Sequence, residues 1–284
     1  MIPSAFRYRR AQTVAEALDL LRQEPEAKLL AGGQSLLPLM KLRLARPGTL
    51  VDISRIDELR RFEVRPDRVV IGAMVRYHQV LANAELRARL PLLPQAVAVI
   101  ADPQVRHRGT VGGSAAHADP ASDLAAVFLA ADAEFVLQGP QGERRVQARD
   151  WFLGPMMSNL QPDELLCRIE IPLAWPPHQA YLKFPHPASG YALAGVAALV
   201  SRAPDGSVED VKVAVTGAGQ LPFAAQGVTA ALKGQTLSRQ LMREAAERGA
   251  ADGTYADDGP YSAAYRQNLA RVMIERALAK ASES

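Results

Sequence analysis

The chain has 284 residues, and the 48% that are hydrophobic supply enough apolar material for a folded core. Its 33 basic and 30 acidic side chains leave a formal net charge of +3, too small an excess to indicate a nucleic-acid partner. The single cysteine, Cys167, excludes an internal disulfide and an iron–sulfur cluster held by four of the chain's own thiolates. Because single cores stop growing at roughly 250–300 residues, we expect two or three subdomains.

Metal-binding, targeting and membrane signals are weak. The five histidines have neither HExxH nor paired spacing, so we predict no metal site in this chain. Residues 1–10 lack the apolar run of a signal peptide, and no stretch reaches the roughly 18 uninterrupted apolar residues that span a bilayer. We therefore expect a cytoplasmic protein.

The N-terminal part alternates helical periodicity with short apolar runs. Thr13 and Glu16 have the spacing of a capping box, and apolar residues then recur at helical intervals. The predicted elements are a helix over Thr13–Gln23, a strand over Lys28–Ala31, a helix over Leu36–Leu44 and a strand over Thr49–Ile53. They predict a β–loop–α–β unit in which a glycine-rich segment joins the first strand to its helix.

The middle of the chain contains one long stretch without a regular pattern. Asp102–Asp123 is too rich in glycine for a regular element and too rich in alanine for a solvated linker, so we interpret it as a buried functional loop. Around it the predicted elements are a hairpin of Phe62–Val64 and Val69–Ala73, a helix over Leu92–Ala101, a helix over Leu124–Ala131, and strands over Glu134–Leu137 and Val146–Ala148.

The segment Pro172–His178 is rich in proline and tryptophan, which indicates a boundary between subdomains. Beyond it, the apolar runs Ala192–Ser201 and Val208–Val215 predict two strands. A last helix is predicted over Ser262–Ala281. Its spacing predicts one face formed by Tyr265, Leu269, Val272 and Met273.

Two segments, Ala31–Leu36 and Thr110–Ser114, each contain a glycine pair beside apolar elements. Glycine lets the backbone approach a ligand, and successive N–H groups at the start of a helix suit phosphate oxygens, so the segments are typical of a diphosphate site. Alternatively, each pair is only a tight turn. A P-loop is absent, and Gly217–Gly219 fails as a Rossmann fingerprint because Pro222 stands where its third glycine belongs.

Four stretches resemble a known flavoprotein family. They are AGGQSLLPLMKLRLARPGTLVDISRI (31–56), IGAMVRY (71–77), IADPQVRHRGTVGGSAAHADPASDLAAVFLAADAEF (100–135) and YRQNLARVMIERAL (265–278). In this order they are similar to the FAD-binding medium subunit of molybdenum hydroxylases, the family of carbon monoxide dehydrogenase and xanthine dehydrogenase. The paired AGG(H/Q)S and T(I/V)GG segments are specific for this group, and the resemblance covers essentially the whole chain.

The resemblance implies an α+β fold with a vanillyl-alcohol-oxidase type FAD-binding domain and a smaller C-terminal domain. The FAD-binding domain would consist of two α/β subdomains, over residues 1–55 and 56–175, and the C-terminal flavoprotein domain would cover residues 176–284. This division agrees with the boundary indicated near Pro172.

The resemblance also implies which residues contact FAD. The two glycine segments would hold the diphosphate between them, and Ala101 would lie in the same site. The aspartate after the second segment, Asp123, would contact the adenosine half. The implied contacts in the glycine segments are Ala31, Gly32, Gly33, Gln34, Ser35, Leu36, Thr110, Gly112, Gly113 and Ser114.

Two further contacts are implied in the C-terminal domain, Lys183 at its start and Tyr191 beside the isoalloxazine ring. Each implied role has an alternative: Asp123 caps a helix, Lys183 is an exposed strand lysine, and Tyr191 is a core or strand tyrosine. Ser189–Gly190 departs from the family pattern, which has Gly–Asp before the aromatic residue. The sequence therefore leaves the contacts of the flavin ring open.

His117 and the basic cluster Arg106–Arg108 have several interpretations. A flavin that only transfers electrons needs no protein base, so His117 is better interpreted as a packing residue or a cofactor contact. The basic cluster is interpreted as a solvated or phosphate-near patch, with docking of an acidic partner surface as the alternative.

By this resemblance, the chain is an electron-transfer subunit without catalytic residues of its own. FAD would take electrons from two 2Fe–2S clusters on a small partner subunit and pass them to an acceptor such as quinone. A large partner subunit would carry the molybdenum cofactor, in a dimer of heterotrimers. The alternatives are a free-standing FAD oxidase or dehydrogenase and an assembly subunit without flavin. The substrate, which is carbon monoxide, an aldehyde or an N-heterocycle, is not encoded in this chain.

Overall fold

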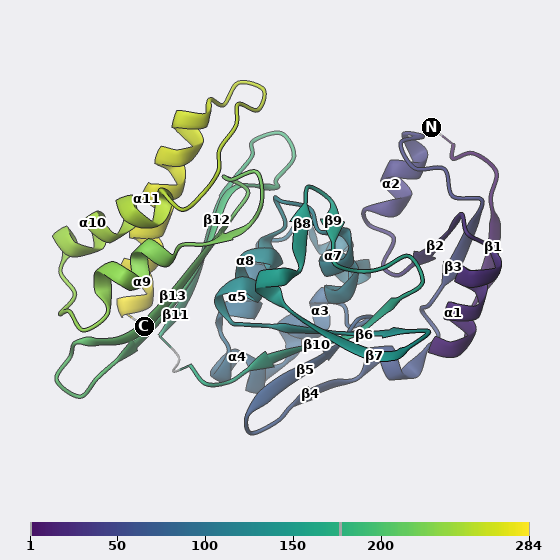
Figure 1. Ribbon diagram of the computed structural model, residues 1–284, viewed down its shortest axis with the longest axis horizontal. Helices are drawn as coiled ribbons and strands as arrows, with labels where there is room; N and C mark the ends of the chain where they lie inside the picture. The colour runs from purple at the N-terminus through teal and green to yellow at the C-terminus, as the bar shows by residue number, and fades with distance from the viewer. Residues whose placement is uncertain (1, 176–177, 284) are drawn as a thin grey trace.

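The computed structural model describes residues 2–175 and 178–283 and shows an α+β chain in three parts that lie side by side (Figure 1). The N-terminal part is built on a parallel sheet of order β1-β3-β2. Its elements are β1 (Arg7–Arg10), α1 (Val14–Gln23), β2 (Ala27–Leu30), α2 (Leu36–Lys41), β3 (Thr49–Asp52) and the 3-10 helix η1 (Asp57–Arg60).

The predicted β–loop–α–β unit is confirmed, because β2 and β3 pair in parallel and α2 connects them. Thr13 caps α1 as its spacing indicates, since its hydroxyl oxygen accepts a hydrogen bond from the Glu16 amide at 3.1 Å. The helix α2 ends at Lys41, earlier than the predicted Leu44, because Arg43 adopts a left-handed conformation with a φ of 59°.

The central part combines an antiparallel sheet of order β4-β5-β10-β6-β7 with helices packed against it. The predicted hairpin is present as β4 and β5. The strands are β4 (Phe62–Val64), β5 (Arg68–Gly72), β6 (Glu134–Gly139), β7 (Gly142–Gln147) and β10 (Leu165–Pro172), with a small β8 (Phe152–Gly154) and β9 (Met157–Ser158) pair. The helices are α3 (Tyr77–Ala82), α4 (Ala84–Arg89), α5 (Leu92–Ala98), α6 (Pro103–Arg108), α7 (Val111–His117), α8 (Asp123–Ala130) and the 3-10 helix η2 (Ala148–Asp150).

The prediction of an irregular buried loop over Asp102–Asp123 is wrong. The stretch contains the short helices α6 and α7, which begin after the caps Asp102 and Thr110. Its first half is largely exposed rather than buried. Gly112 lies inside α7 because the helix packs directly on Ala73, where a Cβ on Gly112 would lie 2.5 Å from the Ala73 Cα. Close packing, and not an irregular backbone, explains this glycine.

The C-terminal part is an antiparallel sheet of order β11-β12-β13-β14 with three helices. Residues 192–200 of β12 are all buried because α11 covers one face of the sheet and α5 and α8 of the central part lie against the other. The elements are β11 (Gln179–Pro185), β12 (Ala192–Arg202), β13 (Val208–Thr216), β14 (Phe223–Ala224), α9 (Gln226–Leu232), α10 (Arg239–Ala250) and α11 (Ala263–Glu283). The two predicted apolar strands are confirmed.

The predicted apolar face of the last helix is correct only in part. Leu269 and Met273 are buried, but Tyr265 is exposed. Its neighbour Arg266 is buried instead and donates hydrogen bonds to the carbonyl oxygens of Gly217 and Ala218 at 2.7 and 2.9 Å. The helix is therefore rotated so that a satisfied arginine, and not an aromatic ring, faces the sheet.

The segment expected to be a boundary connects the central and C-terminal parts. Strand β10 ends at Pro172 and β11 begins at Gln179. Pro176 and Pro177, which belong to this expected boundary, lie outside the described residues. Buried apolar residues form three clusters, one centred on each part, and the central cluster extends into the inner face of the C-terminal sheet.

Glu170 lies on β10, the middle strand of the central sheet, and Arg68 of the neighbouring β5 and Arg168 each contact its carboxylate at 2.8 Å. Burial raises the pKa of Glu170, but hydrogen bonds from Arg168 and Arg68 outweigh burial and hold the pKa at about 2. A pKa depressed in the folded state stabilises the fold above the ordinary value of 4.5, and this contribution is lost as pH falls toward 2.

Replacing this carboxylate in Glu170→Gln is therefore expected to lower the free energy of unfolding at pH 7 by at most about 3 kcal/mol. The difference between the variant and the native chain should stay constant from pH 7 to about pH 5 and shrink as the pH falls below 4.5 toward 3. Urea unfolding at several pH values measures it. A difference that is equal at all pH values would contradict the assigned pKa.

Candidate functional site

The two glycine segments, far apart in sequence, meet in the structure. Ala31–Leu36 connects β2 to α2, and Thr110–Ser114 forms the start of α7. Gly32 lies so close to the end of α6, just before the second segment, that a Cβ on it would be 2.4 Å from the Arg108 carbonyl oxygen. A Cβ on Gly113 would lie 3.6 Å from the Ala31 Cβ. Glycine at position 32 is thus required by the close approach of two backbones.

The backbone amides of the two segments differ in availability. Within the described residues, no protein atom accepts a hydrogen bond from the amides of residues 32–35. In the second segment every amide after Thr110 is engaged: those of Val111 and Gly112 donate to Val75 and Ala73, and those of Gly113 and Ser114 donate to Thr110. The first segment therefore offers a run of consecutive free donors to an anion, and the second does not, although both were expected to do so.

The second segment provides hydroxyl groups instead. The Ser114 hydroxyl lies 2.8 Å from that of Ser122. Burial raises the pKa of Tyr77 to about 12, although a hydrogen bond with Ser114 acts to lower this pKa. The Thr216 hydroxyl on β13 donates toward the carbonyl oxygens of Pro120 and Ser122 at 2.7 and 2.9 Å. These contacts fix the loop after α7 to the C-terminal sheet.

Asp123 and Lys183 form a buried ion pair across the central and C-terminal parts. Their charged atoms are 2.8 Å apart, and only 6% and 5% of the two side chains is exposed. The Tyr181 hydroxyl donates a second hydrogen bond to the carboxylate at 2.6 Å. The interpretation of Lys183 as an exposed strand lysine is therefore wrong. Burial raises the pKa of Asp123, while the charge and hydrogen bond of Lys183 act to lower it.

Tyr181 is a site residue that the sequence reasoning missed. Alternate residues of a strand share a face, so Tyr181 and Lys183 on β11 both point toward Asp123. This alternation is visible in the sequence Tyr181–Leu182–Lys183. The alternation indicates a shared contact with Asp123 only when the position of Asp123 in the fold is known.

Tyr191 and Ala101 lie at exposed positions near this cluster. Tyr191 follows the left-handed Gly190 in the β11–β12 turn and is 46% exposed, so it is not a core tyrosine. Burial of part of its ring, with Asp119 and Asp123 nearby, raises its pKa. Ala101 has a φ of 41°, which an alanine rarely adopts, and its carbonyl oxygen accepts a hydrogen bond from Arg106. Arg106 is therefore not simply a solvated arginine.

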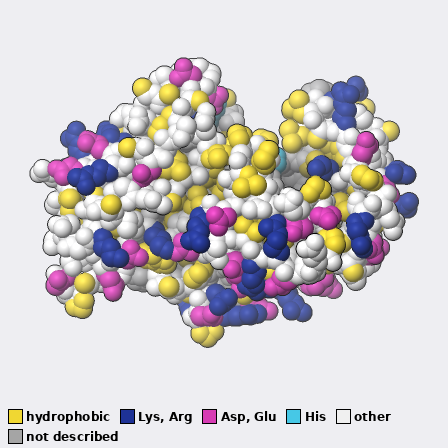
Figure 2. All heavy atoms as spheres, viewed as in Figure 1, with side chains coloured by type: hydrophobic (Ala, Val, Ile, Leu, Met, Phe, Trp, Pro, Cys, Tyr) yellow, Lys and Arg dark blue, Asp and Glu magenta, His cyan; other side chains and the backbone are white. Residues whose placement is uncertain are grey.

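Figure 2 shows a hollow between the N-terminal and C-terminal parts, above the central part. In Figure 1 the same region is bordered by α2 on one side and by the C-terminal part on the other, with α7 and α8 below. The first glycine segment precedes α2, and Asp123 begins α8. The predicted site residues thus surround one region of the molecule.

Outside this region, the described residues offer no thiol of lowered pKa and no metal site. Burial, and then the charge of Glu58, raises the pKa of the Cys167 thiol to about 12, so it is a poor nucleophile and a poor covalent attachment point. In the described part of the chain, no three histidine, cysteine or carboxylate side chains are placed to hold a metal ion. No helix among the described residues has the length and apolar character needed to cross a bilayer.

Comparison with known proteins identifies the family. Residues 4–174 match the model of the FAD binding domain in molybdopterin dehydrogenase, and residues 179–281 match that of the CO dehydrogenase flavoprotein C-terminal domain. The chain belongs to this family of FAD-binding medium subunits. The resemblance inferred from the glycine segments is confirmed, as is the α+β fold with an FAD-binding domain and a smaller C-terminal domain.

Members of this flavoprotein family with different substrates are similar over their full length. The carbon monoxide dehydrogenase medium chain of Hydrogenophaga pseudoflava is 40% identical over 98% of this chain and 97% of that protein. The glyceraldehyde dehydrogenase medium chain of Sulfolobus acidocaldarius is 36% identical over 98% of both. The structure of quinoline 2-oxidoreductase from Pseudomonas putida 86 has a TM-score of 0.94 at 30% identity, covering 100% of this chain and 99% of that one.

Proposed function

We propose that this chain binds FAD non-covalently in the hollow between its N-terminal and C-terminal parts and serves as an electron-transfer subunit. The observation that supports this most directly is the set of free amides at residues 32–35, beside the close contact of Gly32 with Arg108. Free backbone donors next to a helix start suit a diphosphate. FAD accepts and releases electrons singly or in pairs, which suits a junction between one-electron and two-electron carriers.

We assign the site residues as follows. The first glycine segment binds the diphosphate through its amides, and the second supports it through the Ser114 hydroxyl and the packing of α7. Asp123, held by Lys183 and Tyr181, orients the cofactor from the C-terminal side. Tyr191 covers one face of the flavin ring and limits its contact with water. The proposed domains are residues 1–55, 56–175 and 176–284.

We further propose the partners that the family implies. A small subunit with two 2Fe–2S clusters supplies electrons, a large subunit with the molybdenum cofactor oxidises the substrate, and the assembly is a dimer of heterotrimers. An acceptor such as quinone receives the electrons. The relatives act on carbon monoxide, glyceraldehyde and quinoline with similar flavoprotein chains, so substrate choice belongs to another subunit. The single thiol, which is half-buried and has a raised pKa, also gives a free-standing oxidase no covalent attachment point.

The isolated chain is expected to bind FAD with near-equal stoichiometry and to show no turnover of carbon monoxide, aldehydes or N-heterocycles. Turnover should appear only when the partner subunits are added. Flavin absorbance per chain and dye-linked activity, with and without partners, measure the two properties. Substantial turnover by the isolated chain would contradict the electron-transfer role, and a chain that binds no flavin would contradict the site.

A further inference from the structure

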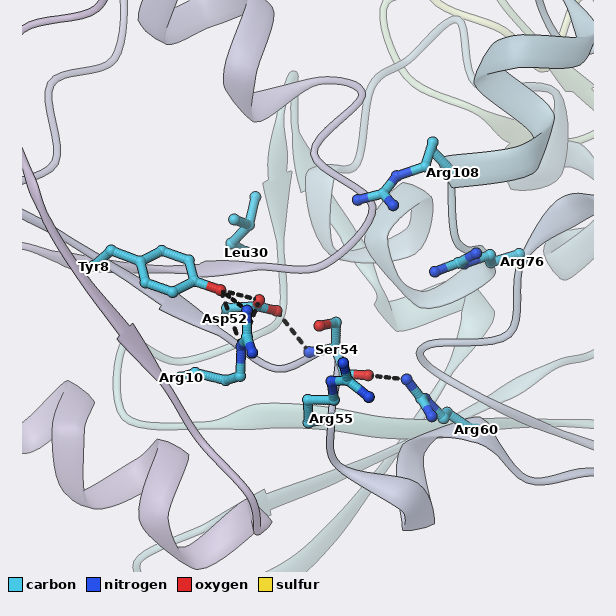
Figure 3. Close-up of a pocket in the computed structure, with 9 residues that line it drawn as sticks. All are labelled: Tyr8, Arg10, Leu30, Asp52, Ser54, Arg55, Arg60, Arg76 and Arg108. Atoms are coloured by element: carbon cyan, nitrogen blue, oxygen red, sulfur yellow. Dashed lines mark hydrogen bonds and ion pairs between the residues drawn. The ribbon is translucent and has the colours of Figure 1, made fainter.

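A second candidate site for an anion adjoins the first glycine segment, because its lining includes Leu30, directly before that segment, and Arg108, whose carbonyl group lies against Gly32. It is a cavity of about 510 Å³ at the carboxyl ends of β1, β2 and β3, shown in Figure 3. Five arginines line it, and only one carboxylate, that of Asp52. We call it the arginine pocket. Its arginines are Arg10, Arg55, Arg60, Arg76 and Arg108.

The single carboxylate of the arginine pocket is already engaged. Asp52 accepts hydrogen bonds from the Tyr8 hydroxyl and from the Ser54 amide, and it lies 3.5 Å from Arg10. These contacts form one end of the pocket, and Figure 3 shows them as a connected group. Asp52 therefore fixes Arg10 and Tyr8 in place and has little capacity to neutralise the other arginines.

Three guanidinium groups are left without a counter-charge. Arg60 is paired with Asp57 and donates to the Ser54 carbonyl oxygen. Across residues 2–175 and 178–283, Arg55, Arg76 and Arg108 have no carboxylate within ion-pair distance. Like charges that converge on one cavity repel one another, so an anion that enters the cavity is favoured electrostatically.

The surface beside the pocket has the composition of a protein interface. Strand β1 is the edge of its sheet, and all four of its residues are exposed. Phe6, Tyr8 and Arg10 alternate along this segment and so share a face; Phe6 and Tyr8 are 40% and 47% exposed. Exposed aromatic rings next to arginines are enriched in protein–protein interfaces and are not required for a free phosphate.

The pocket also lacks the features by which this chain would bind a phosphate. Its lining contains no glycine, and the free amides lie in the separate segment at residues 32–35. A planar guanidinium pairs in a bidentate manner with a carboxylate as well as with a phosphate, so the exposed rings of Phe6 and Tyr8 and the absence of those free amides from the lining favour a polypeptide carboxylate. We propose that the arginine pocket and the exposed face of β1 receive an acidic polypeptide segment of a partner subunit. This inference rests on the proposed function, which supplies the partner.

The test reverses two of the free charges in the full-length chain. The double variant Arg55→Glu with Arg76→Glu, carrying an affinity tag, is expressed together with the partner subunits. The matched control is Arg149→Glu with Arg239→Glu, which changes the net charge equally at exposed positions outside the pocket. The pocket variant is expected to retrieve at least about tenfold less of the partner chains. It should keep its FAD content and circular dichroism spectrum, and the control should keep all three.

A second variant keeps the charge and identifies the occupant. Arg55→Lys places an amine in the pocket, which a carbodiimide joins directly to a neighbouring carboxylate. Mass spectrometry of the treated complex should find position 55 linked to an aspartate, a glutamate or the carboxyl terminus of a partner chain. Because this variant preserves the positive charge, it remains informative if the double reversal unfolds the chain.

The outcomes separate this inference from the proposed function. Unchanged retrieval of partners by the pocket variant, or a cross-link found only within this chain, would overturn the inference alone. Tight binding of pyrophosphate or ADP by the isolated chain, lost in the pocket variant, would show a small-molecule site instead and would also overturn it. A native chain that retrieves no partner and binds no FAD would instead overturn the proposed function.

Discussion

Replacing Gly32 with alanine is expected to weaken the binding of FAD strongly. A Cβ at this position would lie 2.4 Å from the Arg108 carbonyl oxygen and 2.9 Å from the Gly109 Cα, and both neighbours are backbone atoms that cannot rotate away. The two segments must therefore separate, which moves the free amides of residues 32–35. Overpacking of this kind costs about 1–3 kcal/mol, and if this cost falls on the bound state the Kd for FAD rises about 5- to 150-fold.

Flavin absorbance per chain and calorimetric titration of the apoprotein with FAD measure this loss. Gly154→Ala is the matched control, because a Cβ there would make only ordinary contacts, the nearest at 3.5 Å to Met157. It should bind FAD as the native chain does. If Gly32→Ala retained FAD at native affinity while folding normally, the first segment could not be the diphosphate site.

Replacing Lys183 with methionine is expected to cost about 3–5 kcal/mol of folding stability, the second large effect. The substitution keeps most of the unbranched side chain but leaves the Asp123 carboxylate buried without its cation. Tyr181 can supply only one hydrogen bond in compensation. Because a stranded carboxylate is less costly when protonated, the loss should be smaller at pH 5 than at pH 8.

Urea unfolding of the apoprotein at the two pH values measures this effect. Lys212→Met is the control: Lys212 pairs with Asp132 across the same two parts but at the surface, where a pair contributes about 1 kcal/mol or less. Adding Asp123→Asn to Lys183→Met should recover part of the lost stability, since it removes the buried charge. A double variant as unstable as the sum of its two single variants would show that the residues do not interact.

Local sequence patterns predicted most elements of this fold. Thr13 caps the first helix through its own side chain, and the apolar runs of β12 and β13 reflect a sheet covered on both faces. The same reasoning failed over Asp102–Asp123. There it treated glycine as a sign of irregular backbone, although Gly112 lies in a helix whose close packing on Ala73 leaves no room for a side chain.

The sequence by itself determined the family, the α+β class and the positions of the glycine segments, because motifs and periodicity are local properties of the chain. It also determined, through one cysteine, that this chain cannot hold an iron–sulfur cluster with four thiolates of its own. Only the tertiary structure decided which amides stay free, because hydrogen-bond partners such as Ala73 and Val75 come from distant elements.

The same limit explains the buried ion pair and the arginine pocket. Asp123 and Lys183 belong to different parts of the chain, and no local pattern indicates that their charges meet in the interior. The arginines of the pocket come from β1, from the segments after β3 and before α3, and from the end of α6. These arginines are dispersed along the sequence, and folding brings their positive charges together in one cavity.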